Sequence, residues 1–230
     1  VLRSIPWPHS LGHFYSAMTG FLGFAMLDGE YKMMGLAPYG SPDYLPFIRQ
    51  NILLTDAPGS YRLNGDLLDY HAALKKQFHP KLLEAFGSPR LSDDAPFTER
   101  HRQIAASAQA AFEEVVGDMA SWAFQQGGKR TNVAIAGGCG LNCSANGKLL
   151  RDGPFTRMYV PPAPHDAGCA VGAALLLHHE RLGKPRQFEM THAYYGPAYG
   201  EQDIGRALCA LGLEARPMAD EEALLQRAVQ

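Results

Sequence analysis

A glycine turn is the first feature of the sequence with a spacing suited to chemistry. In AIAGGCGLN (134–142), a β-rich run enters Gly137 and Gly138 directly before a helix-forming stretch. Backbone N–H groups at such a helix start can bind an anion, and glycine lets a ligand approach the main chain closely. The turn matches neither GxGxxG nor GxxxxGK[ST], and a purely structural turn is the alternative. The segment is therefore a candidate phosphate site.

A carboxylate follows the second β-rich run of the same region. In PPAPHDAGCAVGAAL (161–175), Asp166 stands where a strand end meets a helix start. A carboxylate at that position can cap the helix or bind a metal ion, and the sequence leaves both roles open. We interpret His165 as a polar neighbour rather than as a ligand.

The segment GEYKMMGLAPYG (29–40) places Glu30 and Lys32 within one helical turn. A carboxylate can accept hydrogen bonds from ribose hydroxyls, and a lysine can serve a phosphate as a point charge. The alternative is a solvated pair with no role.

His9 and His13 have the spacing that places two imidazoles on one helix face, as in zinc motifs. No acidic residue lies between them as in HExxH, and Pro8 puts His9 before the helix, so a metal role is not favoured. Four other histidines are interpreted as surface or helix-end residues: His71, His79, His178 and His179.

The elements that must position these residues form an α/β pattern. TNVAIAGG (131–138) and TRMYVPP (156–162) are β-rich, and a helix-forming stretch follows each. This order predicts a βαβα unit with the two strands parallel and adjacent. Before it, apolar residues at helical spacing predict a long, largely buried helix over 97–126, capped by Asp93 or Asp94 and ended by Gly127-Gly128.

Shorter elements are predicted toward both ends of the chain. The first part should contain a helix within 10–26, a short helix ended by Gly35, a helix within 43–51 and a hairpin within 52–70. Residues 185–200 are rich in proline, glycine and aromatics and are typical of a linker. Two short amphipathic helices should follow it.

Composition excludes several classes of protein. Hydrophobic residues make up 46% of the 230 residues, which is enough for a packed core. The 21 basic and 23 acidic residues give a net charge of -2 without basic runs, so neither nucleic acid nor an anionic membrane is an expected partner. No membrane span or signal peptide is recognisable, the four cysteines form no CxxC pair, and we expect a cytoplasmic protein with buried, reduced cysteines.

Five segments taken together, in order, are more specific than any one of them. They resemble the O-carbamoyltransferase family of nodulation and of cephamycin and tobramycin biosynthesis, and the resemblance covers about residues 4–200. The segments are PHSLGHFYSAMTGFLGF, GEYKMMGLAPYG, IAASAQAAFEEV, AGGCGLNCSANGKLL and PPAPHDAGCAVGAAL. YYGPAYGEQDI is similar to the family's junction with its next domain.

The resemblance implies an actin-like ATPase fold of the sugar-kinase, chaperone and RNase H-like superfamily, related to the tRNA threonylcarbamoyl-adenosine transferase. Residues 1–188 would be the second half of the carbamoyl-transfer domain, and 189–230 a linker and the start of an adenylate-forming domain. Family enzymes use ATP and carbamoyl phosphate to make a carbamoyl-adenylate. They then transfer the carbamoyl group to a hydroxyl of a sugar or antibiotic, with iron or a similar divalent ion at the transfer site.

The resemblance also implies roles for six residues. Gly137, Gly138 and Asn142 would form the nucleotide loop, Glu30 and Lys32 would face the ribose, and Asp166 would bind the metal. Cys139 and Gly140 depart from the family's Val-Ala pair. The family's HxxxH metal pair and its adenylate-forming arginines are expected outside residues 1–230, so this segment alone is expected to be inactive.

Two other functions are compatible with the same sequence features. One is an ATPase or small-molecule kinase of the same superfamily, which would use magnesium and a catalytic aspartate. The other is a non-catalytic nucleotide-binding module. An upstream HxxxH and a downstream adenylate-forming domain would favour carbamoyl transfer. The acceptor, the metal and the oligomeric state are not encoded in any motif seen here.

Overall fold

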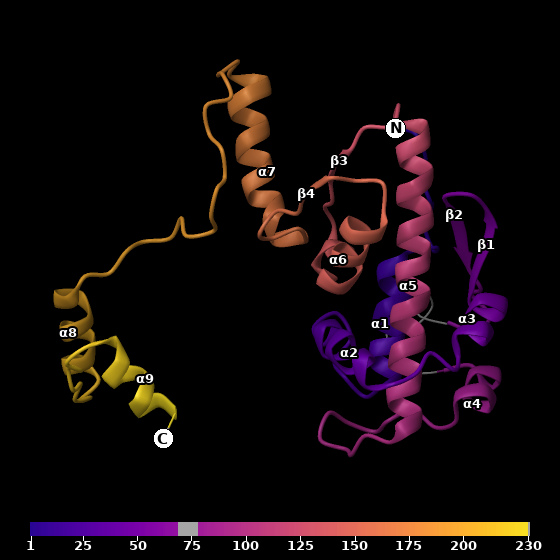
Figure 1. Cartoon of the computed structure of the whole chain (residues 1–230), viewed down its shortest axis with the longest axis horizontal. Coiled ribbons are helices and arrows are strands. Elements are labelled where there is room, and N and C mark those ends of the chain that lie inside the picture. The colour runs from indigo at the N-terminus through magenta and orange to yellow at the C-terminus, as the bar shows by residue number, and fades with distance from the viewer. Residues whose placement is uncertain (69–77, 230) are drawn as a thin grey trace. The chain divides into compact units, whose positions relative to one another are not determined.

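A computed structural model describes residues 1–68 and 78–229 (Figure 1). The chain divides into two compact units, Val1–Lys184 and Pro185–Gln230. The assignment of residues 1–188 and 189–230 to two domains stays a prediction. The predicted surface histidine His71 and the end of the predicted hairpin segment, 69–70, lie outside the described residues.

The first unit begins with a mainly helical part. Its elements are α1 (Leu11–Phe21), α2 (Glu30–Leu36), the 3-10 helix η1 (Ala37–Tyr39), α3 (Leu45–Asn51), β1 (Leu53–Ala57), β2 (Ser60–Leu63), α4 (Pro80–Phe86) and α5 (Glu99–Gln126). The predicted helices and hairpin are present, although α2 continues through Gly35 instead of ending there. β1 and β2 pair antiparallel, with Leu53 opposite Leu63.

The helix α5 organises this part of the molecule. It packs against α1, α2, α3 and α6 (Figure 1). Its buried apolar residues recur every three or four positions, and they include Ile104, Ala108 and Phe112. Burial ends at Val115, so the predicted largely buried helix is fully buried only in its first part. The remaining turns, residues 116–126, are only partly buried or exposed.

The predicted cap of α5 is wrong. The helix begins at Glu99, after Thr98, and Thr98 forms a reciprocal capping box with His101. The backbone N–H of Thr98 donates to Nδ1 of His101 at 3.1 Å. Asp93 lies too far upstream to cap the helix, and its carboxylate pairs with Lys32 instead.

The His101 cap should make the stability of the first unit depend on pH. Burial, together with the charges of Arg100 and Arg90, lowers the pKa of His101 below its usual value of 6.5. A lowered pKa means that the neutral ring is the folded form, so stability is complete above pH 6.5 and declines as the pH falls below it. Protonation also removes the Nδ1 acceptor, and losing a cap costs about 1 kcal/mol.

We therefore expect the urea midpoint of unfolding to fall between pH 7 and pH 5, and His101→Gln to flatten that dependence. His79→Gln is the matched control, because His79 caps the short helix α4. An unchanged pH dependence in His101→Gln would contradict the assignment.

The second part of the first unit is the predicted βαβα arrangement. Its elements are β3 (Asn132–Ala134), the 3-10 helix η3 (Gly138–Leu141), α6 (Cys143–Asp152), β4 (Arg157–Tyr159), the 3-10 helix η4 (Asp166–Gly168), α7 (Cys169–Leu176) and the π-helix η5 (Leu177–Arg181). β3 and β4 pair in parallel, with Val133 opposite Met158, which confirms the predicted neighbouring strands. The fold class is α/β.

The second unit contains α8 (Glu201–Ala210) and α9 (Glu221–Val229), the two short helices predicted after the linker. The expectation of buried cysteines is wrong for most of them, because Cys143, Cys169 and Cys209 are exposed and only Cys139 is partly covered. Within the described residues, no helix is both long and apolar enough to cross a membrane.

Candidate nucleotide-binding site

The predicted glycine turn lies directly after β3. The backbone N–H of Gly137 donates to the carbonyl of Pro164 at 2.7 Å, which joins this turn to the loop that follows β4. Gly137 has φ +95°, a conformation that side-chain-bearing residues rarely adopt. A Cβ atom on Gly137 or Gly138 would meet no other atom within 4 Å. The turn therefore has an open side on which a ligand can approach the backbone.

Asn142 links this turn to the helix that follows. Its Oδ1 atom accepts from the backbone N–H of Ala145 at 2.9 Å, which caps α6. The side chain is buried, and its amide also pairs with the amide of Gln109 on α5 through two hydrogen bonds of 3.0 Å. The predicted nucleotide residue Asn142 is thus also a structural cap.

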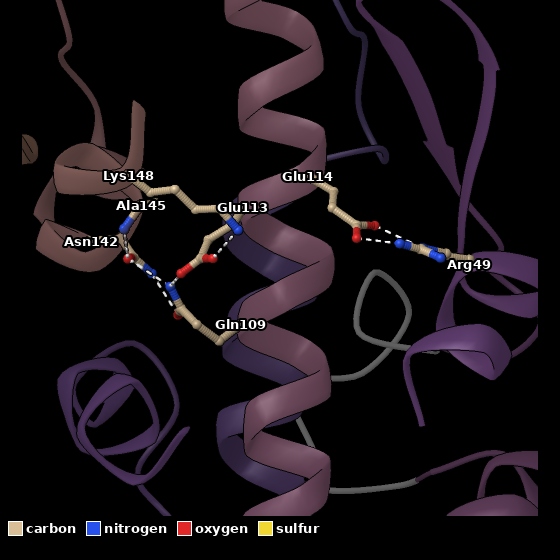
Figure 2. A network of polar contacts seen from close by, with 7 residues as sticks. All are labelled: Arg49, Gln109, Glu113, Glu114, Asn142, Ala145 and Lys148. Atoms are coloured by element: carbon tan, nitrogen blue, oxygen red, sulfur yellow. Dashed lines mark hydrogen bonds and ion pairs between the residues drawn. The ribbon is translucent and has the colours of Figure 1, made fainter. Parts of the chain in front are cut away.

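Gln109 is the centre of a polar network that sequence reasoning missed (Figure 2). Its Oε1 atom accepts from the hydroxyl of Tyr15 at 2.6 Å, and its Nε2 atom donates to Glu113 at 2.8 Å. Glu113 pairs with Lys148 of α6 at 3.0 Å. The only signal in the sequence is one glutamine within the alanine-rich buried stripe of α5.

Burial dominates the electrostatics of this network. It raises the pKa of Tyr15 well above its usual value, and the nearby carboxylates act in the same direction, whereas the amide of Asn142 opposes them. The hydroxyl of Tyr15 therefore stays protonated and remains a hydrogen-bond donor at neutral pH.

A small pocket of about 140 Å³ lies between α5 and α6, beside the network. Its lining includes the polar residues Glu113, Ser121, Lys148 and Asp152. Sites for drug-sized ligands measure roughly 300–1,000 Å³, so this pocket is too small for a nucleotide. The open side of the glycine turn is the better candidate.

Glu30 and Lys32 do not act as a pair. Glu30 accepts from the hydroxyl of Ser16 at 2.5 Å and from the backbone N–H of Leu27 at 2.8 Å. Lys32 pairs with Asp93, and this hydrogen bond raises the pKa of Lys32. Both side chains have partners within the protein, which differs from the solvated pair considered above, and their contact with a ribose stays a prediction.

Asp166 is the first residue of η4 and is exposed. The side chain that caps this helix belongs to His165, whose Nδ1 atom accepts from the backbone N–H of Ala167 at 3.4 Å. A Cβ atom on Gly168 would lie 2.0 Å from the carbonyl oxygen of Ala163, so a residue with a side chain does not fit at this position of the loop. Asp166 therefore occupies an exposed position in a loop that packs closely on itself.

The described residues do not by themselves bring together enough ligands for a metal ion. Across residues 1–68 and 78–229, no group of three or more His, Cys, Asp or Glu side chains could hold an ion. His9 lies before α1 as predicted, and its Nδ1 atom accepts from the backbone N–H of Leu63 at 3.1 Å. The ring of His13 contacts Trp7. Asp166 could supply at most one ligand to a site completed by other groups.

Comparison with known proteins decides the family. The sequence model of the protein family "Carbamoyltransferase N-terminus" matches residues 1–175 of this chain. This range contains the glycine turn, Gln109 and Asp166. The chain belongs to the carbamoyltransferase family. The resemblance inferred from the five sequence segments is thereby confirmed.

Three relatives show how far the similarity to other proteins extends. The chain is 41% identical to nodulation protein NolO of Bradyrhizobium diazoefficiens, over 87% of the chain and 34% of the relative. It is 38% identical to nodulation protein NolNO of Sinorhizobium fredii, over 92% of the chain and 29% of the relative. An uncharacterized protein of Synechocystis is 42% identical, over 87% of the chain and 33% of the relative. The chain spans about a third of the length of these relatives.

Proposed function

We propose that this chain is part of an ATP-dependent O-carbamoyltransferase. Carbamoyl phosphate would be hydrolysed to carbamate and phosphate, and the carbamate would displace pyrophosphate from ATP to give a carbamoyl-adenylate. The carbamoyl group would then pass to a hydroxyl of a sugar or another natural product, with release of AMP. The observation that carries the proposal is the family match over residues 1–175, which includes an open glycine turn between a strand and a helix.

The transfer step has clear chemical requirements. The acceptor oxygen attacks the carbamoyl carbon, the bond from that carbon to the phosphate oxygen of AMP breaks, and the hydroxyl proton passes to solvent water. Backbone N–H groups at Gly138 and at the start of α6 would hold the phosphate of the departing AMP, since a helix N-terminus favours an anion. Asn142 would keep these groups in place, and Glu30 and Lys32 lie on α2, an element that would face the ribose.

The proposal extends to the fold and the remaining ligands. Residues 1–188 would form half of an actin-like ATPase domain, and residues 189–230 would lead into an adenylate-forming domain. A divalent metal, iron by resemblance, would polarise the carbamoyl carbonyl when bound. Asp166 would provide one ligand, and because the described residues do not complete the site, we assign this ion no step.

Gly138→Val in the full-length protein tests the nucleotide site. The side chain would project into open space, so the fold should persist, but it would block the approach of a phosphate. We expect ATP affinity, measured by isothermal titration calorimetry, to fall at least about tenfold, a loss of about 1.4 kcal/mol. Gly172→Val is the matched control, because a Cβ atom on Gly172 of α7 also meets nothing within 4 Å. Equal ATP affinity in the two variants would refute the site.

A further inference from the structure

We propose that Gln109 is a positioning residue, which holds the glycine turn and the start of α6 in the shape that binds the nucleotide. The inference rests on the proposed function, and it assigns a role to a residue on a different element, 33 positions before Asn142. Gln109 would not touch the nucleotide. It would act through Asn142.

The hydrogen bonds of Gln109 leave its amide no freedom. A glutamine amide has two N–H donors and a carbonyl oxygen with two lone pairs. The donors go to Asn142 and Glu113, and the oxygen accepts from Asn142 and Tyr15. The carboxylate of Glu113 can only accept when ionised, so the NH₂ group of Gln109 must face it. This requirement fixes the orientation of the Gln109 amide, and therefore how the amide bonds to Asn142 (Figure 2).

The Asn142 side chain connects Gln109 to the start of α6. Its Oδ1 atom receives both the Gln109 amide and the backbone N–H of Ala145, so the cap of α6 and the contact with α5 share one atom. Gln109 and Asn142 are only 6% and 7% exposed, and water cannot easily replace either partner. The place where α6 begins is therefore set by α5 and, through Tyr15, by α1.

A polar network at this position has a specific consequence. An apolar pair of the same shape could pack two helices at similar stability, because a buried hydrogen bond adds little net free energy. A saturated buried network instead selects one geometry. A phosphate site requires its hydrogen-bond donors to lie within about 0.5 Å of the positions that bind the phosphate. A network that allows only one geometry meets this requirement.

The test is Gln109→Met in the full-length protein, a change that keeps side-chain length and removes every hydrogen bond of the amide. We expect ATP affinity to fall at least about tenfold and amide hydrogen exchange in residues 138–146 to become faster. Gln103→Met is the matched control. Gln103 lies on the same helix and donates to Asp43 at 2.7 Å on the exposed side.

Tyr15→Phe is the milder second variant, because it deletes only the hydroxyl that donates to Gln109. We expect it to weaken ATP binding a few-fold in the same direction, and it decides the matter if Gln109→Met does not fold. A purely structural role would lower the melting temperature of these variants and leave the affinity of the folded protein for ATP unchanged. That result would overturn the inference.

The failure of the inference and the failure of the proposed function have different signatures. If the unmodified protein and Gln103→Met both bind ATP, and the Gln109 and Tyr15 variants bind it equally well, only the positioning role is lost. If the unmodified protein does not bind ATP at all, the proposed function fails, and the role of Gln109 in nucleotide binding is overturned with it.

Discussion

Asp166→Ala in the full-length protein should lower carbamoyl transfer and metal affinity by at least about 100-fold. Even residues that only support a metal ligand change metal affinity by 10–100-fold, so loss of a ligand should cost no less. The fold should persist, because Asp166 is exposed at the start of η4 and His165 provides the capping side chain there. Removing its charge from a helix start costs less than about 1 kcal/mol.

Metal content, melting temperature and transfer rate should be measured on one preparation. Asp152→Ala is the matched control, since Asp152 is an exposed carboxylate at the last residue of α6, within the same βαβα unit. Normal metal content with normal transfer in Asp166→Ala would show that this carboxylate is not a ligand. Lost transfer with normal metal content would instead place Asp166 at the substrate.

Phe112→Ala should be the most destabilising of the single truncations discussed here, with a loss of about 3–5 kcal/mol in the free energy of unfolding. Phe112 is 2% exposed in the buried half of α5, and its ring meets that of Tyr15 edge to face at 5.1 Å. The cavity would open next to the Gln109 network. The variant should therefore lose ATP affinity as well as stability.

The control for this prediction is Phe124→Ala on the same helix. Phe124 also makes an edge-to-face contact, with Phe155 at 5.9 Å, but it is only partly buried in the outer half of α5. Urea-induced unfolding should show a clearly smaller loss for Phe124→Ala. Similar losses in the two variants would mean that the core does not centre on the first half of the helix.

Periodicity and turn residues predicted most of the local structure. The spacing of Ile104, Ala108 and Phe112 was sufficient to predict the helix α5. The β-rich runs 131–138 and 156–162 were sufficient to predict two parallel strands. These signals are readable because an element that buries one face must repeat its apolar residues with its own period. Helix ends were less predictable, since Thr98 and not Asp93 caps the start of α5.

The chemistry of the site was only partly visible in the sequence. Gly137 and Gly138 could be singled out because a strand entering two glycines before a helix is a local pattern. Gln109 could not, because its role depends on Asn142 and Tyr15, which lie far from it in the sequence. A hydrogen-bond network between three elements has no period and leaves no spacing to recognise.

By itself, the sequence determined the α/β class, the order of the elements and, through five ordered segments, the carbamoyltransferase family. Only the tertiary structure decided which polar side chains form hydrogen bonds and ion pairs with one another within the protein. It assigned Glu30 to Ser16 and Lys32 to Asp93, and it joined Asn142 to Gln109. The physical reason is that helix and strand formation depend on neighbours along the chain, whereas a side-chain hydrogen bond depends on which elements pack together in space.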